Sequence, residues 1–249
     1  MIPKIIHYCW FGNNPKTNLI KRCIKSWREK CPDYQIIEWN ESNFNVNQCN
    51  FTKDAYSIGK WAFVSDYARF QILNNIGGVY LDTDVELFKS LNDFLNYKMF
   101  TGFESYNRVN PGLIWGSEKE TRLVDEILNV YRNKDFFDSN GIPVLETVVD
   151  IVTKILVQKG LQLDGKKQCV DDLMIFPEDF FSPKSYFTGK ETITHNSYTI
   201  HHFAASWKPW YVNFEKRTWE FFGLKDKIIL SRIKRKIKRL YITLGKTSS

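Results

Sequence analysis

The sequence predicts an α/β fold that opens with a parallel strand-helix-strand unit. A short apolar strand, an amphipathic helix and a second strand follow one another within residues 2–39. Farther along, a buried helix ends at a Gly-Gly pair and is followed by an apolar strand within residues 60–81. Parallel strands need a crossover connection, and a helix is the usual one. With 249 residues the chain is long enough for one large domain with its own core.

The opening unit predicts a ligand site at its strand ends. The stretch PKIIHYCWF reads as the first strand and Tyr34–Trp39 as the second. Between them, Pro15 stands near the start of a helix whose apolar residues recur at helical spacing, namely Leu19, Ile20, Cys23, Ile24, Trp27 and Cys31. Because ligands of open α/β sheets collect at the carboxyl ends of strands, we expect a ligand crevice around Tyr8 to Gly12.

A helix packed on two sides is expected from Lys60 to Ile76, because its apolar positions lie on more than one face. Gly77 suits the helix C-cap, and Val79 to Leu81 reads as a central strand that runs into Asp82-Thr83-Asp84. Carboxylates are costly to bury without a partner. We therefore expect positive charge beside the two aspartates.

The later elements are predicted from shorter apolar patterns. These are strands near residues 99–103, 113–115 and 174–176, helices near residues 120–131 and 145–159, and a strand from Tyr198 that runs out into a polar and aromatic turn by Trp207.

Composition indicates a cytoplasmic protein with reduced thiols. No apolar run approaches the roughly 20 residues of a membrane span. The start, MIPKIIHYCWFG, lacks the features of a signal peptide. The cysteines form no CxxC pair and are odd in number, which fits packing residues better than a disulfide framework or a zinc site; they are Cys9, Cys23, Cys31, Cys49 and Cys169.

The net charge of +7 is concentrated in one C-terminal segment. Lys225 to Lys246 holds nine Lys or Arg residues against the single acid Asp226, around an apolar stripe with helical spacing. We expect a main domain over residues 1–224 and a basic amphipathic helix over residues 225–249, which would hold the protein at the inner face of the cell membrane. A helix that packs on the domain is the alternative. No nucleic acid partner is expected, because no nucleic-acid fold motif accompanies the tail.

Asp82 and Asp84 form a DxD pattern that suits a divalent metal. In extended backbone their side chains share a face and can converge on one cation. Oxygen ligands favour Mg²⁺ or Mn²⁺, which also coordinates substrate phosphates, so a nucleotide diphosphate is the expected cargo. A solvated turn is the alternative for an isolated DxD, but the preceding Gly-Gly and apolar strand favour the metal site.

Three stretches together resemble glycosyltransferase family 32, the DxD sugar transferases of bacterial capsule and O-antigen loci and of fungal mannan initiation. They are IPKIIHYCWFG, SDYARFQILNNIGGVYLDTDVE and HHFAASW, in this order. The chain is similar, more distantly, to the glucosylating domains of large bacterial toxins. The resemblance implies a GT-A fold and a metal-dependent, anomer-retaining hexosyl- or N-acetylhexosaminyltransferase. The expected donor is a UDP-sugar, and the expected acceptor is a lipid-linked saccharide. The enzyme would act in surface polysaccharide biosynthesis.

The resemblance also implies roles for individual residues around the donor. Trp10 matches an aromatic that stacks on the nucleobase, with a core tryptophan as the alternative. Asp66 and Arg69 match a pair that binds the donor sugar, with a surface salt bridge as the alternative. Tyr80 matches a residue near the donor and also suits a buried strand. The donor-binding set is completed by Tyr8, Ser65, Asn110, Ser206 and Trp207.

The motif HHFAASW is expected to complete the metal site. Adjacent residues of a strand point to opposite faces, so only one of His201 and His202 can join the metal. We favour His202, which stands four residues before Ser206. Ser206 and Trp207 match positions near the metal and the β-phosphate. Asn110 matches an asparagine that reaches the donor sugar or the acceptor, with a plain Asn-Pro-Gly turn as the alternative.

A front-face mechanism is expected for the transfer. The sequence singles out no carboxylate as the nucleophile of a double displacement, and Glu104 and Asp171 are the two exceptions to consider. In the front-face reaction the acceptor hydroxyl attacks from the leaving-group side and a phosphate oxygen takes its proton. The alternative function is a nucleotide-sugar or polyanion-binding module without turnover, and the intact Asp66, Arg69, Asp82 and Asp84 favour the enzyme.

Overall fold

The protein is described by a computed structural model, and the description extends over residues 1–186 and 188–204. Its helices are α1 (Asn18–Lys30), α2 (Asn50–Ser57), α3 (Trp61–Ile76), α4 (Arg122–Arg132), α5 (Val148–Gln158) and α6 (Glu178–Phe181), with a 3₁₀ turn, η1, at Asn92–Phe94. Its strands are β1 (Ile5–Cys9), β2 (Gln35–Trp39), β3 (Gly78–Tyr80), β4 (Val85–Leu87), β5 (Met99–Ser105), β6 (Arg108–Val109), β7 (Trp115–Ser117), β8 (Gln168–Val170), β9 (Leu173–Phe176) and β10 (Thr199–His201).

The strands form one large mixed sheet and one small ribbon. The large sheet has the order β2-β1-β3-β7-β5-β9-β8, with β6 paired to β5. β1 runs parallel to both β2 and β3, whereas β7 is antiparallel to its two neighbours. The ribbon pairs β10 with β4 in antiparallel register. The α/β class and the parallel strand-helix-strand opening are confirmed, and this Rossmann-like start agrees with the GT-A fold that the resemblance implies.

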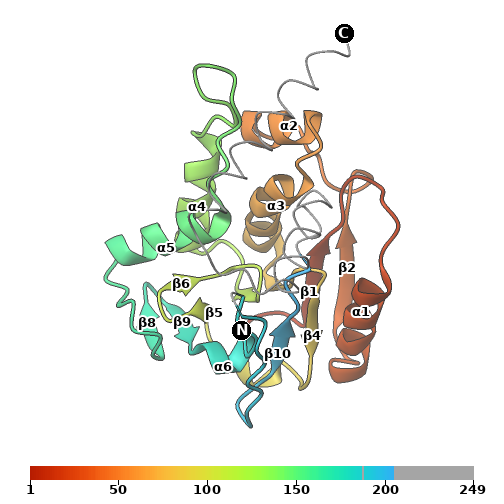
Figure 1. Cartoon of the computed structure of the whole chain (residues 1–249), viewed down its shortest axis with the longest axis vertical. Coiled ribbons are helices and arrows are strands. Elements are labelled where there is room, and N and C mark those ends of the chain that lie inside the picture. Colours follow the sequence, from red (N-terminus) through yellow and green to blue (C-terminus); the bar gives the residue numbers. More distant parts are fainter. Residues whose placement is uncertain (187, 205–249) are drawn as a thin grey trace, which may run out of the picture. The chain divides into compact units, whose positions relative to one another are not determined.

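Helices cover both faces of the sheet. Along β1 the side chains alternate, so that Ile6 and Tyr8 join one hydrophobic core and Cys9 joins the other. The first core contains residues of α1, β4, η1 and α6, and the second contains residues of α2, α3, α4 and α5. In Figure 1, α1 lies at the right of the view, and α4 and α5 lie to the left of α3. Two cores on one sheet are the usual arrangement for a parallel α/β fold.

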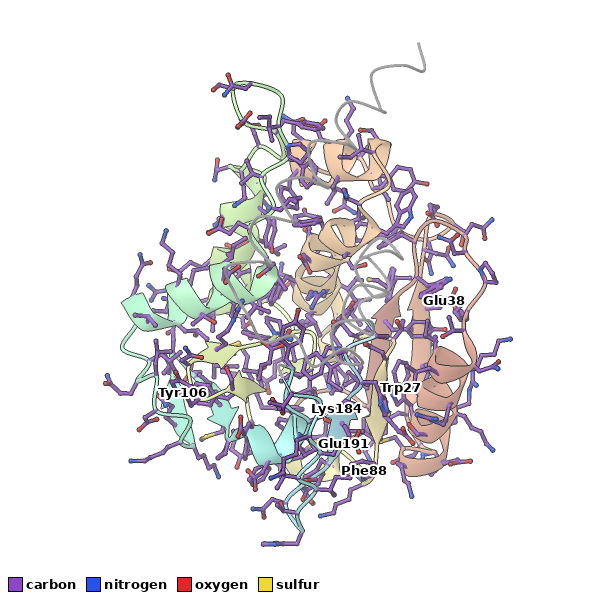
Figure 2. The ribbon with its side chains drawn as sticks, in the orientation of Figure 1. Trp27, Glu38, Phe88, Tyr106, Lys184 and Glu191 are labelled. Carbon is purple, nitrogen blue, oxygen red and sulfur yellow. The ribbon has the colours of Figure 1, made fainter. Side chains whose placement is uncertain are left out.

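Helix α1 fastens the small ribbon to the domain. Its N-cap is Thr17, whose side chain accepts a hydrogen bond from the Ile20 backbone. Near its other end, Trp27 is fully buried and donates Nε1–H to the Val85 carbonyl at 2.7 Å; Figure 2 labels this side chain. Ser26 Oγ accepts from the Leu87 backbone N–H at 2.9 Å. These two bonds fix β4, and β4 in turn pairs with β10.

The Gly-Gly pair is required by the junction between α3 and β3. Gly77 has φ +73° and caps α3 by donating its N–H to the Leu73 carbonyl. Gly78 has φ +112°, and a Cβ there would lie 2.8 Å from His7 Nε2. Glycine alone adopts such φ values without strain. The sharp junction lets β3 enter the sheet directly beside β1.

Several sequence predictions differ from the observed elements. α2, β4, β6, β8 and α6 were not expected, and β7 begins at Trp115 instead of Leu113. All five cysteines are free, as expected, but Cys169 is exposed and does not pack in a core. Within the described residues no helix is both long and apolar enough to cross a membrane. Ser206, Trp207 and the basic segment lie outside the described residues.

Candidate active site

Asp82 and Asp84 lie just beyond β3, and each carboxylate meets a basic side chain from a different part of the chain. Asp82 lies 3.4 Å from Arg69 Nη2, and Asp84 lies 2.9 Å from His201 Nε2. Arg69 belongs to α3, whereas His201 ends β10. The positive charge expected beside the two aspartates is therefore supplied by Arg69, with the imidazole of His201 as a second basic partner.

Arg69 is a buried cation at the centre of a small network. Its Nη2 also lies 2.8 Å from Asp66 Oδ1, and its guanidinium stands 4.7 Å from the centre of the Tyr80 ring. Its side chain is only 4 % exposed, which excludes a surface salt bridge. Burial opposes the charge of Arg69, but the neighbouring negative groups, Asp82 above all, raise its pKa above the ordinary value. Arg69 Nη1 is buried with no hydrogen-bond partner among the described residues.

The pKa of Asp66 is raised, as is that of Asp82, whereas the pKa of Asp84 is lowered. Burial raises the pKa of Asp66 to about 6, with the charge of Arg69 opposing the rise and that of Asp82 adding to it. A carboxyl group with this pKa changes its protonation state close to neutral pH, unlike an exposed aspartate.

Asp84 is held by the chain that follows β10. Its Oδ1 pairs with His201, and its Oδ2 accepts the Ala204 backbone N–H at 2.7 Å. Burial by itself would raise the pKa of Asp84, but the charge and hydrogen bond of His201, together with the Ala204 amide, lower it to about 2. In return Asp84 raises the pKa of His201 against the effect of burial. For Asp82, burial dominates and raises the pKa, with Arg69 opposing the rise.

The structure favours His201 over His202 as the third candidate metal ligand. The two residues point to different sides, as expected for neighbours in a strand. His202 lies next to Glu86, with its Nε2 2.8 Å from Glu86 Oε2, so the expectation that His202 joins Asp82 and Asp84 does not agree with the geometry. The spacing to Ser206 could not decide between them, because the pairing of β10 with β4 sets which histidine faces Asp84.

The donor atoms of Asp82, Asp84 and His201 suit a divalent metal. One ligand atom from each residue lies within 4.8 Å of the others. In addition, His201 Nδ1 is buried without a partner among the described residues. Two carboxylates and an imidazole form a hard-to-intermediate donor set that Mn²⁺ or Mg²⁺ accepts. These residues therefore fit the metal that the resemblance implies.

The Asn110-Pro111-Gly112 turn presses against Asp82. Asn110 Oδ1 accepts the Gly112 N–H at 2.7 Å, so the asparagine builds the turn that was weighed as the alternative. Its Nδ2 also donates to Glu104 Oε1 at 3.0 Å, which brings that carboxylate to the same turn. Gly112 accepts the Asp82 N–H at its carbonyl, and a Cβ on Gly112 would lie 2.1 Å from Asp82 Oδ2. Only glycine leaves room for the observed Asp82 side chain.

A cavity of about 1020 Å³ opens at the carboxyl ends of β1 and β2. Trp10 lines it, half-buried, with Lys16 Nζ 5.5 Å from its ring centre. Glu38, at the carboxyl end of β2 and labelled in Figure 2, also lines it. Tyr8 donates its hydroxyl hydrogen to Glu38 Oε2 at 2.5 Å and so contacts a residue that lines the cavity. The crevice expected around Tyr8 to Gly12 is present, and Trp10 faces it instead of filling the core.

The remaining predicted residues have structural contacts of their own. Ser65 donates its hydroxyl to the Trp61 carbonyl at 3.1 Å, and its own carbonyl accepts from Arg69 Nε at 3.2 Å. Tyr80 is a fully buried strand tyrosine beneath Arg69. Asp171 pairs with Lys159 at 2.9 Å in the turn between β8 and β9.

The sequence analysis did not single out Gly112 or Glu38. Gly112 carried a local signal, because a glycine after Asn-Pro suits a tight turn, but its approach to Asp82 is a long-range contact. Glu38 carried the signal of an acidic residue at the end of the second strand, a position that often meets a ribose in nucleotide-binding sheets.

Part of the chain is similar to a known protein family. A family model described as the glycosyltransferase sugar-binding region containing the DXD motif matches residues 17–101. Residues 17–101 are therefore similar to this DXD sugar-binding region. The matched residues include Asp66, Arg69, Tyr80 and both DxD aspartates, whereas Trp10, Asn110 and His201 lie outside them.

Curated relatives are similar over part of their length. The chain is 33 % identical over 121 residues to a protein of Acanthamoeba polyphaga mimivirus named as a glycosyltransferase, covering 44 % of this chain and 45 % of that protein. It is 25 % identical over 143 residues to inositol phosphoceramide mannosyltransferase 3 of Schizosaccharomyces pombe, covering 53 % of this chain and 38 % of that protein. The matches thus span less than half the length of these two relatives.

Among solved structures, the chain is similar to the PaToxG glycosyltransferase, with 18 % identity and a TM-score of 0.49 over 64 % of this chain and 69 % of that one.

Replacing Gly112 by alanine should weaken metal binding at the DxD pair. The added Cβ cannot coexist with Asp82 Oδ2 in its observed position, so Gly112→Ala should lower Mn²⁺ affinity by about tenfold or more, equivalent to about 1.4 kcal/mol. Electron paramagnetic resonance titration of free Mn²⁺ measures the change. Gly160→Ala is the control, because Gly160 has φ +100° and nothing within 4 Å of its Cβ position. It should lower stability and leave Mn²⁺ affinity alone. Equal Mn²⁺ affinity in Gly112→Ala and the wild type would contradict the assignment of Asp82 as a ligand.

Proposed function

We propose that this protein is a metal-dependent glycosyltransferase that moves a sugar from a nucleotide-diphosphate sugar to a saccharide acceptor. The observation that carries the proposal is the convergence of Asp82, Asp84 and His201 beside the buried Arg69–Asp66 pair. This cluster follows β3, and β3 runs parallel to β1, whose own carboxyl end opens into the Trp10 cavity. A donor can therefore lie along one edge of the sheet, with its base at the cavity and its diphosphate at the carboxylates.

The metal held by Asp82, Asp84 and His201 would neutralise the charge that develops on the leaving diphosphate. The remaining groups position the donor. Trp10 offers a ring on which a nucleobase stacks, and Lys16 adds a positive charge over the same ring. Ser206 and Trp207 belong to the proposal through the resemblance alone.

Arg69 and Asp66 are proposed to hold the donor sugar. Arg69 has a buried donor, Nη1, without a partner among the described residues, and sugar hydroxyls are acceptors for such a group. Asp66, with a pKa of about 6, accepts hydroxyl hydrogen bonds when ionised. The ring of Tyr80 packs against the guanidinium of Arg69 in a cation–π contact. Asn110 is proposed to lie beside the donor sugar as well, held there by its hydrogen bond to Glu104.

We propose that the transfer retains the anomeric configuration by a front-face reaction. Glu104 lies at the site and contributes to the field at His201, but its Oε1 is engaged by Asn110. Asp171 is engaged by Lys159. The acceptor hydroxyl would attack from the side of the leaving group and pass its proton to the departing phosphate oxygen, so that no enzyme carboxylate forms a covalent intermediate.

The donor is proposed to be a UDP-hexose or UDP-N-acetylhexosamine, and the acceptor a lipid-linked saccharide of capsule or O-antigen type. The name of the fission yeast relative describes transfer of mannose to inositol phosphoceramide, which is a lipid. That similarity supports a membrane acceptor for this chain as well. The proposed site of action is the inner face of the cell membrane.

Hydrolysis of nucleotide sugars in the presence of Mn²⁺ tests the proposed function. A panel of nucleotide sugars should include one that the wild type hydrolyses slowly without acceptor. Asp82→Asn and Asp84→Asn should each lower this rate by about 10²-fold or more, because each removes a ligand from the metal that stabilises the leaving group.

Asp164→Asn is the matched control, since Asp164 is an exposed loop aspartate, and it should keep the wild-type rate. Circular dichroism verifies that the three variants fold. Near-wild-type rates in both DxD variants would sink the metal assignment. Mn²⁺-dependent nucleotide binding without turnover of any sugar nucleotide, with or without acceptor, would favour the binding module instead.

The basic segment, residues 225–246, is proposed to bind anionic membranes. A chain ending at residue 224 should hydrolyse the donor as the full chain does, but should sediment with phosphatidylglycerol vesicles far less. Binding of the full chain should weaken with salt, because screening at physiological ionic strength acts over about 8 to 10 Å. Equal sedimentation of both proteins would exclude the membrane role, and a truncated chain that fails to fold would favour a helix packed on the domain.

A further inference from the structure

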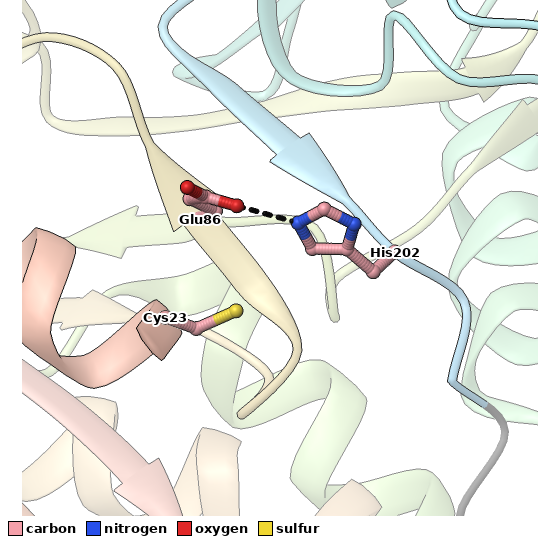
Figure 3. Close-up of side chains that lie close together, drawn as sticks. All are labelled: Cys23, Glu86 and His202. Atoms are coloured by element: carbon pink, nitrogen blue, oxygen red, sulfur yellow. Dashed lines mark hydrogen bonds and ion pairs between the residues drawn. The ribbon is translucent and has the colours of Figure 1, made fainter. Parts of the chain in front are cut away.

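A second cluster of metal-ligating side chains lies outside the DxD site. Cys23, Glu86 and His202 come from α1, β4 and the residue after β10, and one ligand atom of each lies within 4.8 Å of the others. Figure 3 shows the three side chains pointing toward one another. Cys23 lies 63 positions before Glu86 in the sequence, and Glu86 lies 116 positions before His202. The packing of α1 and β10 against β4 brings the three residues together.

The geometry of the cluster is close to that of a bound metal. His202 Nε2 lies 2.8 Å from Glu86 Oε2, a hydrogen-bond distance, so these two atoms would move slightly apart to coordinate a metal. Around zinc, tetrahedral ligand atoms at 2.0 to 2.3 Å from the metal are roughly 3.5 Å apart. Because the ligand atoms all lie within 4.8 Å of one another, side-chain shifts of about 1 Å would bring them to tetrahedral spacing.

The cluster is sheltered but reachable. Cys23 is fully buried, whereas the side chains of His202 and Glu86 are 14 % and 24 % exposed. A metal ion can enter from the side of Glu86 and His202 and meet the thiol at the bottom. The protein therefore supplies three donors, and water is available for a fourth position, as in zinc sites that keep one open ligand.

Arg22 is a cationic neighbour of the Cys23, Glu86 and His202 cluster. Its Nε lies 3.4 Å from Glu86 Oε2, and its side chain is 58 % exposed. A side chain this exposed can turn to solvent at little cost, because exposed ion pairs contribute little to stability. Arg22 thus competes with a metal for Glu86 without blocking it.

We propose that Cys23, Glu86 and His202 form a second divalent-metal site, of the zinc-binding class, that ties α1, β4 and the end of β10 together. A thiolate, an imidazole and a carboxylate select Zn²⁺ over the Mn²⁺ or Mg²⁺ that suits Asp82 and Asp84. Binding forms the metal–sulfur bond and releases the thiol proton to solvent.

The consequence of such a site is structural support for the DxD centre. His202 directly follows His201, and its backbone N–H donates to the Asp84 carbonyl at 3.0 Å. A metal that holds the His202 side chain therefore restrains the segment that carries His201 and the Ala204 amide to Asp84. The site is separate from the proposed transfer chemistry, and its test does not depend on activity.

Cobalt titration of the full chain tests the proposal, because Co²⁺ replaces Zn²⁺ and reports its ligands by absorption. The wild type should bind Co²⁺ with a near-ultraviolet thiolate-to-metal band that saturates at one equivalent and is abolished by Zn²⁺. Cys23→Ala should lack the band. Glu86→Gln and His202→Asn should each weaken Co²⁺ binding by about tenfold or more, because each removes a ligand and even the loss of an outer-shell partner costs about 10- to 100-fold.

Three control variants show whether the band arises from Co²⁺ bound at Cys23, Glu86 and His202. Cys169→Ser removes the exposed thiol and should leave the band unchanged. Asp82→Asn should also keep it, because Asp82 belongs to the DxD cluster. Arg22→Gln should increase Co²⁺ affinity, because it removes the competing charge.

The absence of a thiolate band in the folded wild type would overturn the proposal, as would a band that is lost in Cys169→Ser and kept in Cys23→Ala. Thermal denaturation supplies a second readout that applies even where a variant is less stable. Zn²⁺ at 100 times its Kd should raise the Tm of the wild type by about 5 °C and that of Cys23→Ala by much less. Equal shifts in both proteins would likewise count against the site.

Discussion

The structure around the candidate site depends on the cost of placing two carboxylates at the buried end of β3. An ionised aspartate out of water requires a cation or several hydrogen bonds. Asp82 forms an ion pair with Arg69, whereas Asp84 pairs with His201 and accepts a hydrogen bond from the Ala204 amide. The two carboxylates lie one residue apart in the chain but are compensated by residues of two different elements, α3 and β10.

The rest of the fold can be understood as the support for those two partners. Arg69 is held by α3, which packs in the second core and ends at the Gly77-Gly78 junction that starts β3. His201 is held by the pairing of β10 with β4, and β4 is fixed by Trp27 and Ser26 of α1. Because α1 also connects β1 to β2, the strand-helix-strand unit that forms the Trp10 cavity indirectly positions the histidine.

The parts of this arrangement that follow local rules were predictable from the sequence. The periodicity of residues 60–76, the glycine pair and the apolar strand gave α3 and β3 within a residue or two, and the βαβ opening followed in the same way. The α2 helix and β4 were missed, because eight and three residues give too short a pattern to distinguish from a loop. Whether Asp66 and Arg69 are buried was not decided by their spacing, since burial depends on which elements cover α3.

Long-range contacts account for the remaining differences. His201 and His202 carry identical local signals, and only the register of β10 on β4 makes His201 the neighbour of Asp84. The cysteines gave no metal spacing, yet Cys23 meets Glu86 and His202 through packing. The most direct test of the account is therefore the Mn²⁺ affinity of His201→Asn compared with His202→Asn, measured in the folded full-length chain. The account predicts a loss of about tenfold or more for His201→Asn and a change within about threefold for His202→Asn. A larger loss for His202→Asn than for His201→Asn would contradict it.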